Sequence, residues 1–487
     1  MHVSDTIGAK VRSGLIWSAV RHWGVRLSGL LLFMVMARLL TPAELGLFAA
    51  ASVVLTFLNL LSDQGLTEAV VQRERISQEQ LNAVFWMNLG VALLVVAALW
   101  GLAPAIASWM NLPPLEPVLR VSALSVPLTA ATFGQMAMRR RQFSYQWIAT
   151  SALTSTVVAG GVALAMAFAG YGVWSLVVQS LLAAGIASLM MWVRPVWRLT
   201  RPTDFAGVRP LVGYGANRLF TYLLDFANTR YIEIFLASSL GPAALGLYAV
   251  GVRVYQALMQ ALSSAILDVA HSGFSRLAND REALVRGYYN SMTATAATAV
   301  PIFCLVAAVA PSMTVVLFGQ RWADSAEVMR WMCLLGAVQV LQFYNGTVFN
   351  AIGRPSLVLL LQVCKVLLTF GALVLVRDQG LRMLVYTYVA SQLATTPLNF
   401  FLLRRILDVS MRRLWQKLWP FVGACVVMVA VAWACGMAAH AFRTPPILGL
   451  LASSVLGMAS YFFFLRVVAY DALREAIAIL RPRAATT

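Results

Sequence analysis

Positively charged side chains occur inside segments of the sequence that are otherwise apolar. Arg26, Arg253 and Lys365 each lie about ten residues from the end of such a segment, without an obvious acidic partner on it. An ionisable group in a bilayer costs at least about 2.5 kcal/mol on insertion scales, so it is expected to face a wet cavity or a ligand. The excess of positive charge favours an anionic ligand, and the planar guanidinium of arginine suits phosphate.

Further titratable and amide side chains lie in the same apolar segments. Asp225 and Thr229 are four residues apart and Arg230 and Glu233 are three apart, so each pair shares a helix face. We expect further basic residues to contact the anion, acidic or histidine side chains to couple transport to an ion, and amides to line a polar cavity. In that order, these candidates are Arg230, Arg218 and Arg21; Asp225, Glu233 and His22; and Gln256, Gln260, Gln339, Gln342 and Asn345.

Several of these residues also have a purely structural interpretation. Arg21 and Arg218 lie near the predicted inner ends of their helices, so their long side chains could reach the lipid headgroups. Arg230 and Glu233 could form a structural ion pair. His22 could be a hydrogen-bonded packing residue. The sequence leaves these alternatives open.

The composition of the chain excludes a water-soluble globular protein. Of its 487 residues, 60% are apolar and only 11% are charged, too few to cover a water-facing surface. A helix that crosses a bilayer needs about 20 apolar residues. Hydropathy and breaks at proline, glycine and charged clusters predict an all-α integral membrane protein with about 14 transmembrane helices, near residues 14–40, 43–62, 80–104, 118–138, 146–169, 172–193, 210–237, 243–268, 287–318, 326–352, 355–376, 383–403, 417–439 and 446–465.

The basic residues predict the orientation of these helices. The net charge is +18, and the segments on the side of the N-terminus hold about four times as many lysines and arginines as the opposite side. Both termini are therefore expected in the cytoplasm, and the charge is assigned to topology rather than to a nucleic-acid partner. The five cysteines and four histidines lack metal-ligand spacing, and no P-loop motif indicates an ATPase.

An internal repeat predicts two lobes of the same topology. Residues 37–49 (ARLLTPAELGLFA) and 237–249 (ASSLGPAALGLYA) are identical at eight of thirteen positions, at an offset of 200 residues. The offset covers six predicted helices, so the lobes should be pseudo-symmetric about an axis along the membrane normal and flank a central cavity. The predicted divisions are 1–209, an N-lobe of six helices; 210–416, a six-helix C-lobe ending in a basic amphipathic linker; and 417–487, two extra helices and a cytoplasmic tail.

Short motifs at the predicted turns resemble those of one transporter family. They occur in order and cover the chain from about residue 14 to 403. They are Asp63-Gln64-Gly65-Leu66 followed by Glu68-Ala69-Val70-Val71-Gln72 and Phe85-Trp86; Leu240-Gly241-Pro242-Ala243-Ala244-Leu245-Gly246-Leu247-Tyr248; Phe318-Gly319-Gln320-Arg321-Trp322; and Asn350-Ala351-Ile352-Gly353-Arg354-Pro355. The chain is similar to bacterial oligosaccharide flippases, the polysaccharide transporter family of the multidrug/oligosaccharidyl-lipid/polysaccharide superfamily.

The resemblance implies a fold, a substrate and a cellular location. It implies two six-helix lobes that open alternately to the two sides of the bacterial inner membrane. The implied substrate is a polyprenyl diphosphate that carries an oligosaccharide repeat unit for exopolysaccharide, capsule or O-antigen, and a polymerase with chain-length machinery would be partners. No cofactor is implied beyond a coupling ion, H⁺ or Na⁺. Many relatives carry an acidic residue in the middle of the seventh helix, where this sequence has Arg230, Tyr231 and Glu233.

Three other functions share some of these sequence features. A peptidoglycan-precursor flippase of the same superfamily would also carry a diphosphate, whereas excess positive charge within the helices argues against an extruder of cationic drugs. A membrane polysaccharide polymerase or ligase would need catalytic groups in sizeable outer loops, and the predicted outer loops are short. We therefore expect a transporter and not an enzyme.

Overall fold

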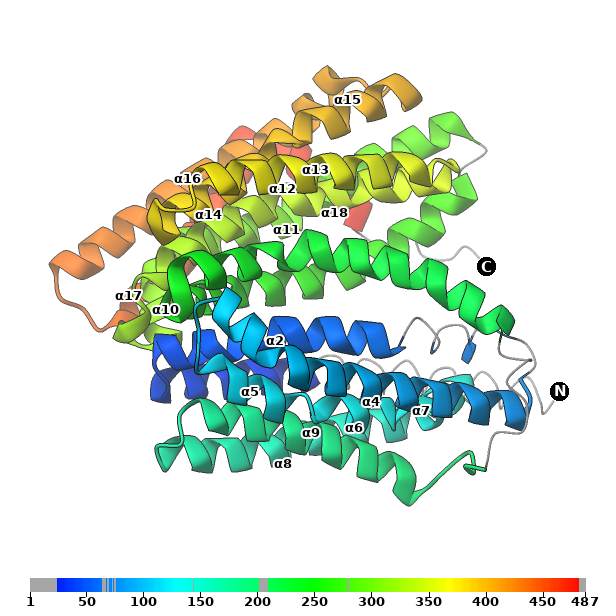
Figure 1. The fold of residues 1–487 in the computed structure, drawn as a ribbon. Coiled ribbons are helices and arrows are strands. Elements are labelled where there is room, and N and C mark those ends of the chain that lie inside the picture. Colours follow the sequence, from blue (N-terminus) through cyan, green and yellow to red (C-terminus); the bar gives the residue numbers. More distant parts are fainter. Residues whose placement is uncertain are drawn as a thin grey trace. The chain divides into compact units, whose positions relative to one another are not determined.

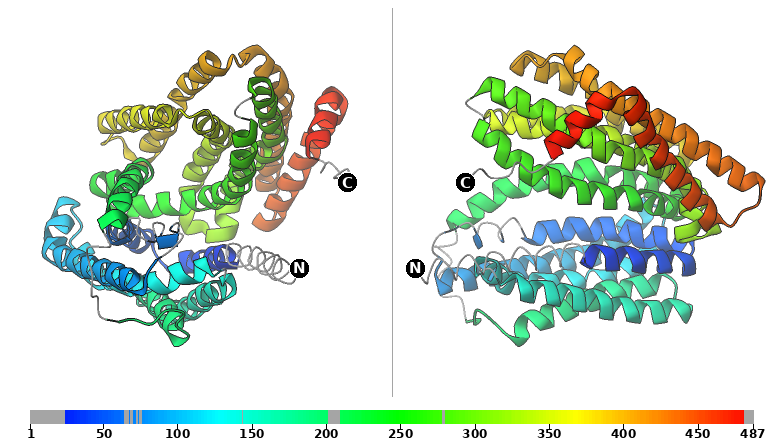
Figure 2. Two further views of the ribbon diagram at one scale, coloured as in Figure 1. Left: turned by 90° about the vertical axis from the view of Figure 1, so that its right-hand side faces the viewer. Right: turned by 180° about the vertical axis from the view of Figure 1, so that it is seen from behind.

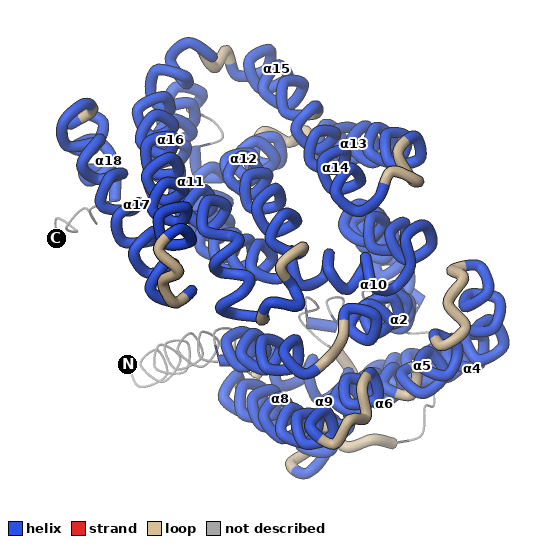
Figure 3. The backbone as a smooth tube through the Cα atoms, turned by 90° about the vertical axis from the view of Figure 1, so that its left-hand side faces the viewer, coloured by secondary structure: helices blue, strands red, loops and turns tan. Residues whose placement is uncertain are grey.

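A computed structural model describes residues 24–480, apart from 64–66, 68–69, 72, 74–75, 143, 201–208 and 278–279. All regular structure in this described part is helical (Figure 3), so the predicted all-α class is confirmed. Arg21, His22 and most of the motif between Gln64 and Gln72 lie outside the described residues.

Ten helices in the described part are long and apolar enough to cross a membrane. The protein is thus a multi-pass membrane protein, while the count of fourteen stays a prediction. The first predicted span is described only from residue 24, and the seventh and eighth lie on either side of a kink at Gly241 within α10, where the backbone is not helical. The fourth and twelfth are divided into α5 (Leu115–Ser122), α6 (Ser125–Ala130) and α7 (Phe133–Arg141), and into α14 (Gly380–Ala394) and α15 (Thr396–Leu407).

The division of the fourth span has local causes. Pro127 has no N–H and therefore cannot donate to the carbonyl of Ala123, where α5 ends. Ser125 and Thr129 donate hydrogen bonds from their hydroxyls to carbonyls three or four residues earlier, at 2.7 and 2.9 Å. Such bonds from side chain to backbone weaken and bend a helix.

The chain folds into two compact units, residues 1–246 and 247–487. The first contains a helix over residues 24–39, α2 (Pro42–Asp63), α4 (Gln78–Trp109), α5–α7, α8 (Tyr145–Phe168), α9 (Val173–Val193) and the first part of α10 (Arg209–Leu277), as Figure 1 shows. Its α2 packs against α4, α5, α6 and α9. An aromatic cluster of Phe85, Phe133 and Trp197 buries the start of α4 against α7 and the segment after α9.

The second unit contains the rest of α10 and all later helices: α11 (Arg281–Phe318), α12 (Ser325–Ala351), α13 (Pro355–Leu375), α14, α15, α16 (Met411–Ala441), α17 (Pro446–Val468) and α18 (Tyr470–Leu480). The antiparallel pair α16–α17, orange and red in Figure 2, packs on α11, and the Tyr461 hydroxyl donates to the Ala297 carbonyl at 3.0 Å. The predicted lobe boundaries at residues 209 and 416 stay predictions.

Candidate substrate-transport site

The two copies of the repeat contact each other through their backbones within the first unit. A Cβ atom at Gly46 would lie 1.6 Å from the carbonyl oxygen of Pro242, and one at Gly246 would lie 2.0 Å from the carbonyl oxygen of Pro42. Equivalent residues of the two copies therefore make reciprocal contacts. Glycine at both positions is what permits this approach, because any side chain would occupy the space of the opposing carbonyl.

The two repeated turns form the starts of their helices in different ways. In the first copy, Thr41 and Glu44 form a capping box: the Thr41 N–H donates to the Glu44 carboxylate at 2.8 Å, and the Glu44 N–H donates to the Thr41 hydroxyl at 3.3 Å. In the second copy, Gly241 has a φ of 80°, a conformation that costs side-chain-bearing residues energy. The reciprocal turns thus differ where Thr41 is replaced by Gly241.

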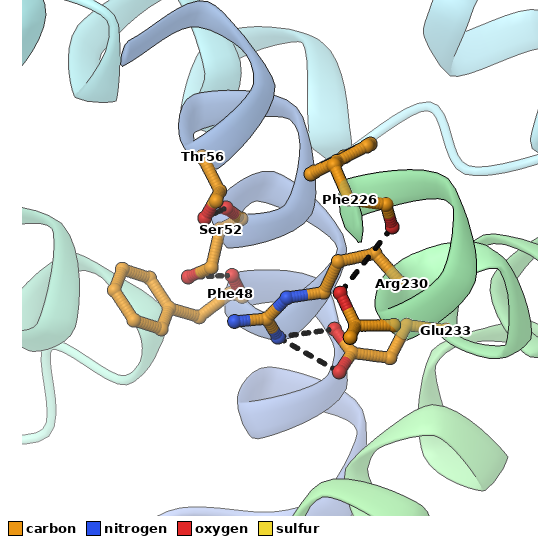
Figure 4. Close-up of polar contacts among 7 residues, drawn as sticks. Phe48, Ser52, Thr56, Phe226, Arg230 and Glu233 are labelled. Carbon is orange, nitrogen blue, oxygen red and sulfur yellow. Dashed lines mark hydrogen bonds and ion pairs between the residues drawn. The ribbon is translucent and has the colours of Figure 1, made fainter. Parts of the chain in front are cut away.

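An ion pair on α10 lies close to the repeated turns. The Arg230 guanidinium donates to both oxygens of Glu233 at 2.8 and 3.0 Å, and Glu233 is only 9% exposed. Figure 4 shows the guanidinium directed toward α2, beside Phe48 and Ser52. The Ser52 hydroxyl donates to the Phe48 carbonyl of its own helix at 2.8 Å. The predicted i, i+3 pair is present, while its role toward a substrate stays a prediction.

The structure describes the side chains of only some of the other predicted residues in the first unit. Arg26 is half-buried on the helix over residues 24–39. Arg218 and Asp225 lie on the described backbone of α10, but their side chains are outside the described part. The structure therefore brings together Arg230 and Glu233, and it leaves the proximity of the other candidates as a prediction.

The predicted amides of the second unit connect neighbouring helices. The Tyr255 hydroxyl donates to Gln339 Oε1 at 2.6 Å, and Gln342 Nε2 donates to the Thr396 hydroxyl at 2.8 Å. The Tyr288 hydroxyl donates to Asn345 Oδ1 at 2.8 Å. Three amides on one face of α12 thus contact α10, α15 and α11 in turn. Such bonds fix the mutual position of helices in a medium without competing water.

Replacing Tyr288 with phenylalanine is expected to destabilise the protein by about 1–3 kcal/mol, because Asn345 Oδ1 would lose its donor in a fully buried place. The measurement is the free energy of unfolding in detergent. Tyr171→Phe, at a residue 59% exposed, is the matched control and should unfold as the wild type does. Equal stability of the Tyr288→Phe protein would contradict a contribution from this hydrogen bond.

Two of the predicted substrate-binding cations belong to the second unit, and they lie on different helices. Arg253 is half-buried on α10, as is Gln256, whereas Gln260 is exposed. Lys365 is half-buried on α13, a helix without any acidic residue. Among the described residues, no group of three or more His, Cys, Asp or Glu side chains could hold a metal ion.

The chain is similar to known proteins in its fold and in its sequence. The fold resembles that of lipid II flippase MurJ in its inward closed conformation, with a TM-score of 0.76 at 11% identity over 94% of this chain and 100% of that one. Lipopolysaccharide biosynthesis protein WzxC of Escherichia coli (strain K12) is 23% identical over 437 residues, 88% of each chain. Succinoglycan biosynthesis transport protein ExoT of Rhizobium meliloti (strain 1021) is 25% identical over 339 residues, 68% of this chain and 67% of its own.

The fold defines the chain as a multi-pass helical membrane protein with a fold similar to that of MurJ. Residues 35–327, more than half of the chain, match the family described as polysaccharide biosynthesis protein. The chain belongs to this polysaccharide biosynthesis protein family, which confirms the family that the motifs at the turns indicated.

Proposed function

We propose that the protein moves polyprenyl-diphosphate-linked oligosaccharide repeat units from the cytoplasmic to the outer leaflet of the bacterial inner membrane. The observation that carries this function is membership of a family of polysaccharide biosynthesis proteins together with the fold of a lipid flippase. The relatives include a named transport protein for succinoglycan, so export of a polysaccharide precursor fits the family. The protein is a transporter and not an enzyme.

The half-buried cations of the helices support an anionic cargo. Arg253 and Lys365 would lower the cost of carrying a diphosphate through hydrocarbon, and Arg26 and Arg230 are half-buried cations of the first unit that could act in the same way. An outward-moving anion gains about 2.3 kcal/mol per charge for each 100 mV of inside-negative potential. The membrane potential could therefore drive export by itself, or together with H⁺ or Na⁺ coupled through an acidic residue such as Glu233.

A peptidoglycan precursor is the second candidate substrate. The likeness to lipid II flippase MurJ favours it, but at 11% identity this likeness concerns the fold and not the cargo. Both substrates share the diphosphate, so the basic residues do not distinguish them. The family match and the named relatives favour a polysaccharide repeat unit.

The test is flipping by the full-length protein in proteoliposomes with an imposed potassium-diffusion potential. Wild-type protein is expected to move a fluorescent polyprenyl-diphosphate oligosaccharide, with lipid II as the comparison substrate. Arg253→Ala and Lys365→Met should each lower the rate about ten-fold, the loss of one charge-assisted hydrogen bond. Arg253→Lys and Lys365→Arg, which keep the charge, should retain most of the rate.

The matched control is Arg474→Ala, at an exposed residue of α18, which should flip at the wild-type rate. No movement of either lipid by the wild-type protein would refute the proposed function. Wild-type rates for both Arg253→Ala and Lys365→Met would refute the role of these two cations while leaving the function in place.

A further inference from the structure

A cavity of about 360 Å³ lies in the second unit where α12 and α14 begin. Its walls combine polar side chains with apolar ones: Asp324, Glu327, Gln379 and Arg382, and Leu381 and Val385. The volume is at the lower end of the range for small-molecule sites, which is about 300–1,000 Å³. None of these residues belongs to the transport site described above.

Glu327 is held in place by three donors around this cavity. Trp331 Nε1 and the Tyr386 hydroxyl donate to its Oε1 at 2.9 and 2.7 Å, while Arg330 reaches its Oε2 at 3.4 Å. The rings of Trp331 and Tyr386 pack with their centroids 5.1 Å apart. One carboxylate oxygen is therefore saturated and fixed, and the other has only a long contact and can accept a further hydrogen bond.

The charges around the cavity balance. Arg382 contacts Asp324 at 3.5 Å, and Arg330 contacts Glu327 at 3.4 Å. A phosphate would be repelled by the two carboxylates, and a bare metal cation would meet two guanidinium groups. An acyl chain would leave all four polar lining residues without partners. The lining suits a neutral ligand with many hydroxyl groups, which donate to carboxylates and accept from arginine and amide groups.

The geometry points to a binding site for a neutral sugar ring at the outer end of the second unit. This inference rests on the proposed function, because the start of α12 faces outward only in the predicted orientation. A repeat unit that leaves the transport path would then have its sugar portion bound by Glu327 and Arg382 against the apolar wall of Leu381 and Val385. The Phe318–Trp322 motif holds the chain in place beside the cavity, because Trp322 is fully buried two residues before Asp324.

The experiment measures binding of neutral methyl hexosides to the full-length protein in lipid nanodiscs by saturation-transfer difference NMR. Wild-type protein is expected to bind at least one hexoside saturably. Glu327→Gln, which removes the charge at constant size, and Leu381→Trp, which fills the cavity, should each weaken binding about ten-fold or more. Arg382→Gln, at a side chain 71% exposed, should also weaken it without a cost in folding.

The matched control is Glu282→Gln, whose carboxylate is 87% exposed and pairs with Arg286 on α11 away from the cavity. It should bind as the wild type does. Absence of hexoside binding by the wild type, or wild-type affinity in both Leu381→Trp and Arg382→Gln, would overturn the site. Binding of Na⁺ or Ca²⁺ at the cavity by a protein that binds no hexoside would overturn it in favour of a cation.

Flipping assays separate this inference from the proposed function. If the wild-type and Leu381→Trp proteins flip the lipid-linked oligosaccharide at equal rates and neither binds hexosides, the sugar site is wrong and the function stands. If the wild-type protein flips neither lipid in the same liposomes, the proposed function fails whatever the binding result.

Discussion

Alanine at Gly46 is expected to destabilise the protein by about 3 kcal/mol, at the upper end of overpacking effects. The added Cβ would lie 1.6 Å from the carbonyl oxygen of Pro242 and 2.8 Å from the backbone nitrogen of Gly246. Both are backbone atoms, so the clash cannot be relieved by rotating a side chain and one turn must move. Gly246→Ala should have a similar effect, because its Cβ would lie 2.0 Å from the Pro42 carbonyl. The measurement is the thermal unfolding midpoint of purified protein, with the flipping rate beside it.

Gly90→Ala is the matched control, since Gly90 lies inside the transmembrane helix α4 and nothing stands within 4 Å of its added Cβ. Its midpoint should equal or exceed that of the wild type, because alanine favours helix over glycine. The Gly46→Ala and Gly246→Ala double variant should lose less than the sum of the single losses, because both substitutions separate the same turns. Strictly additive losses, or wild-type midpoints in the single variants, would contradict a direct backbone contact.

The sequence predicted the repeated turns but not their contact. Identity at eight of thirteen positions placed two turns at equivalent places in two lobes. Nothing in that identity shows that Gly46 meets Pro242 and Gly246 meets Pro42, because contact between distant segments depends on how the helices pack. A signal was nonetheless present: glycine stands at the same place in both copies, four residues after the shared proline, where helix propensity alone disfavours it.

Hydropathy predicted the long helices well and the interrupted ones less well. The helices α8, α9, α13, α16 and α17 lie close to the predicted spans, because an apolar run of about 20 residues has few other ways to satisfy its backbone in a bilayer. The breaks at Ala123 and Thr395 were missed. They depend on hydrogen bonds from serine and threonine hydroxyls to carbonyls and on Pro127 and Pro397, which a window average does not register.

Charged residues within the predicted helices indicated one of the two polar clusters and not the other. Arg230 and Glu233 were predicted as a pair because helical spacing places residues three apart on one face. The cluster around Glu327 was missed, although Arg330 and Trp331 lie three and four residues away on the same helix, because the Tyr386 hydroxyl that completes it comes from α14, 59 residues away in sequence. Spacing along one helix finds pairs on that helix, whereas a site between two helices requires their packing.

Breaking the Arg230–Glu233 pair from one side is expected to cost more than removing it entirely. Arg230→Met leaves a carboxylate that is only 9% exposed without its donor, and this should destabilise the protein by about 3 kcal/mol, the lower end for a buried pair because Arg230 is partly exposed. Glu233→Leu should cost about 1 kcal/mol, since a guanidinium with 36% of its side chain exposed can stay hydrated. The Arg230→Met and Glu233→Leu double variant should recover most of the loss, because no buried charge then remains unpaired.

Transport by the double variant decides what the pair is for. The folded double variant is expected to flip the lipid-linked oligosaccharide about ten-fold more slowly than the wild type, because the guanidinium directed toward α2 would no longer meet the diphosphate. The control is the exposed Arg286–Glu282 pair, whose double replacement should change stability by less than about 1 kcal/mol and leave flipping unchanged. A double variant that is stable and flips at the wild-type rate would show that neither Arg230 nor Glu233 takes part in transport. Slow flipping at wild-type stability would instead place Arg230 in the path of the anion, since a purely structural pair would lose transport only as it loses folding.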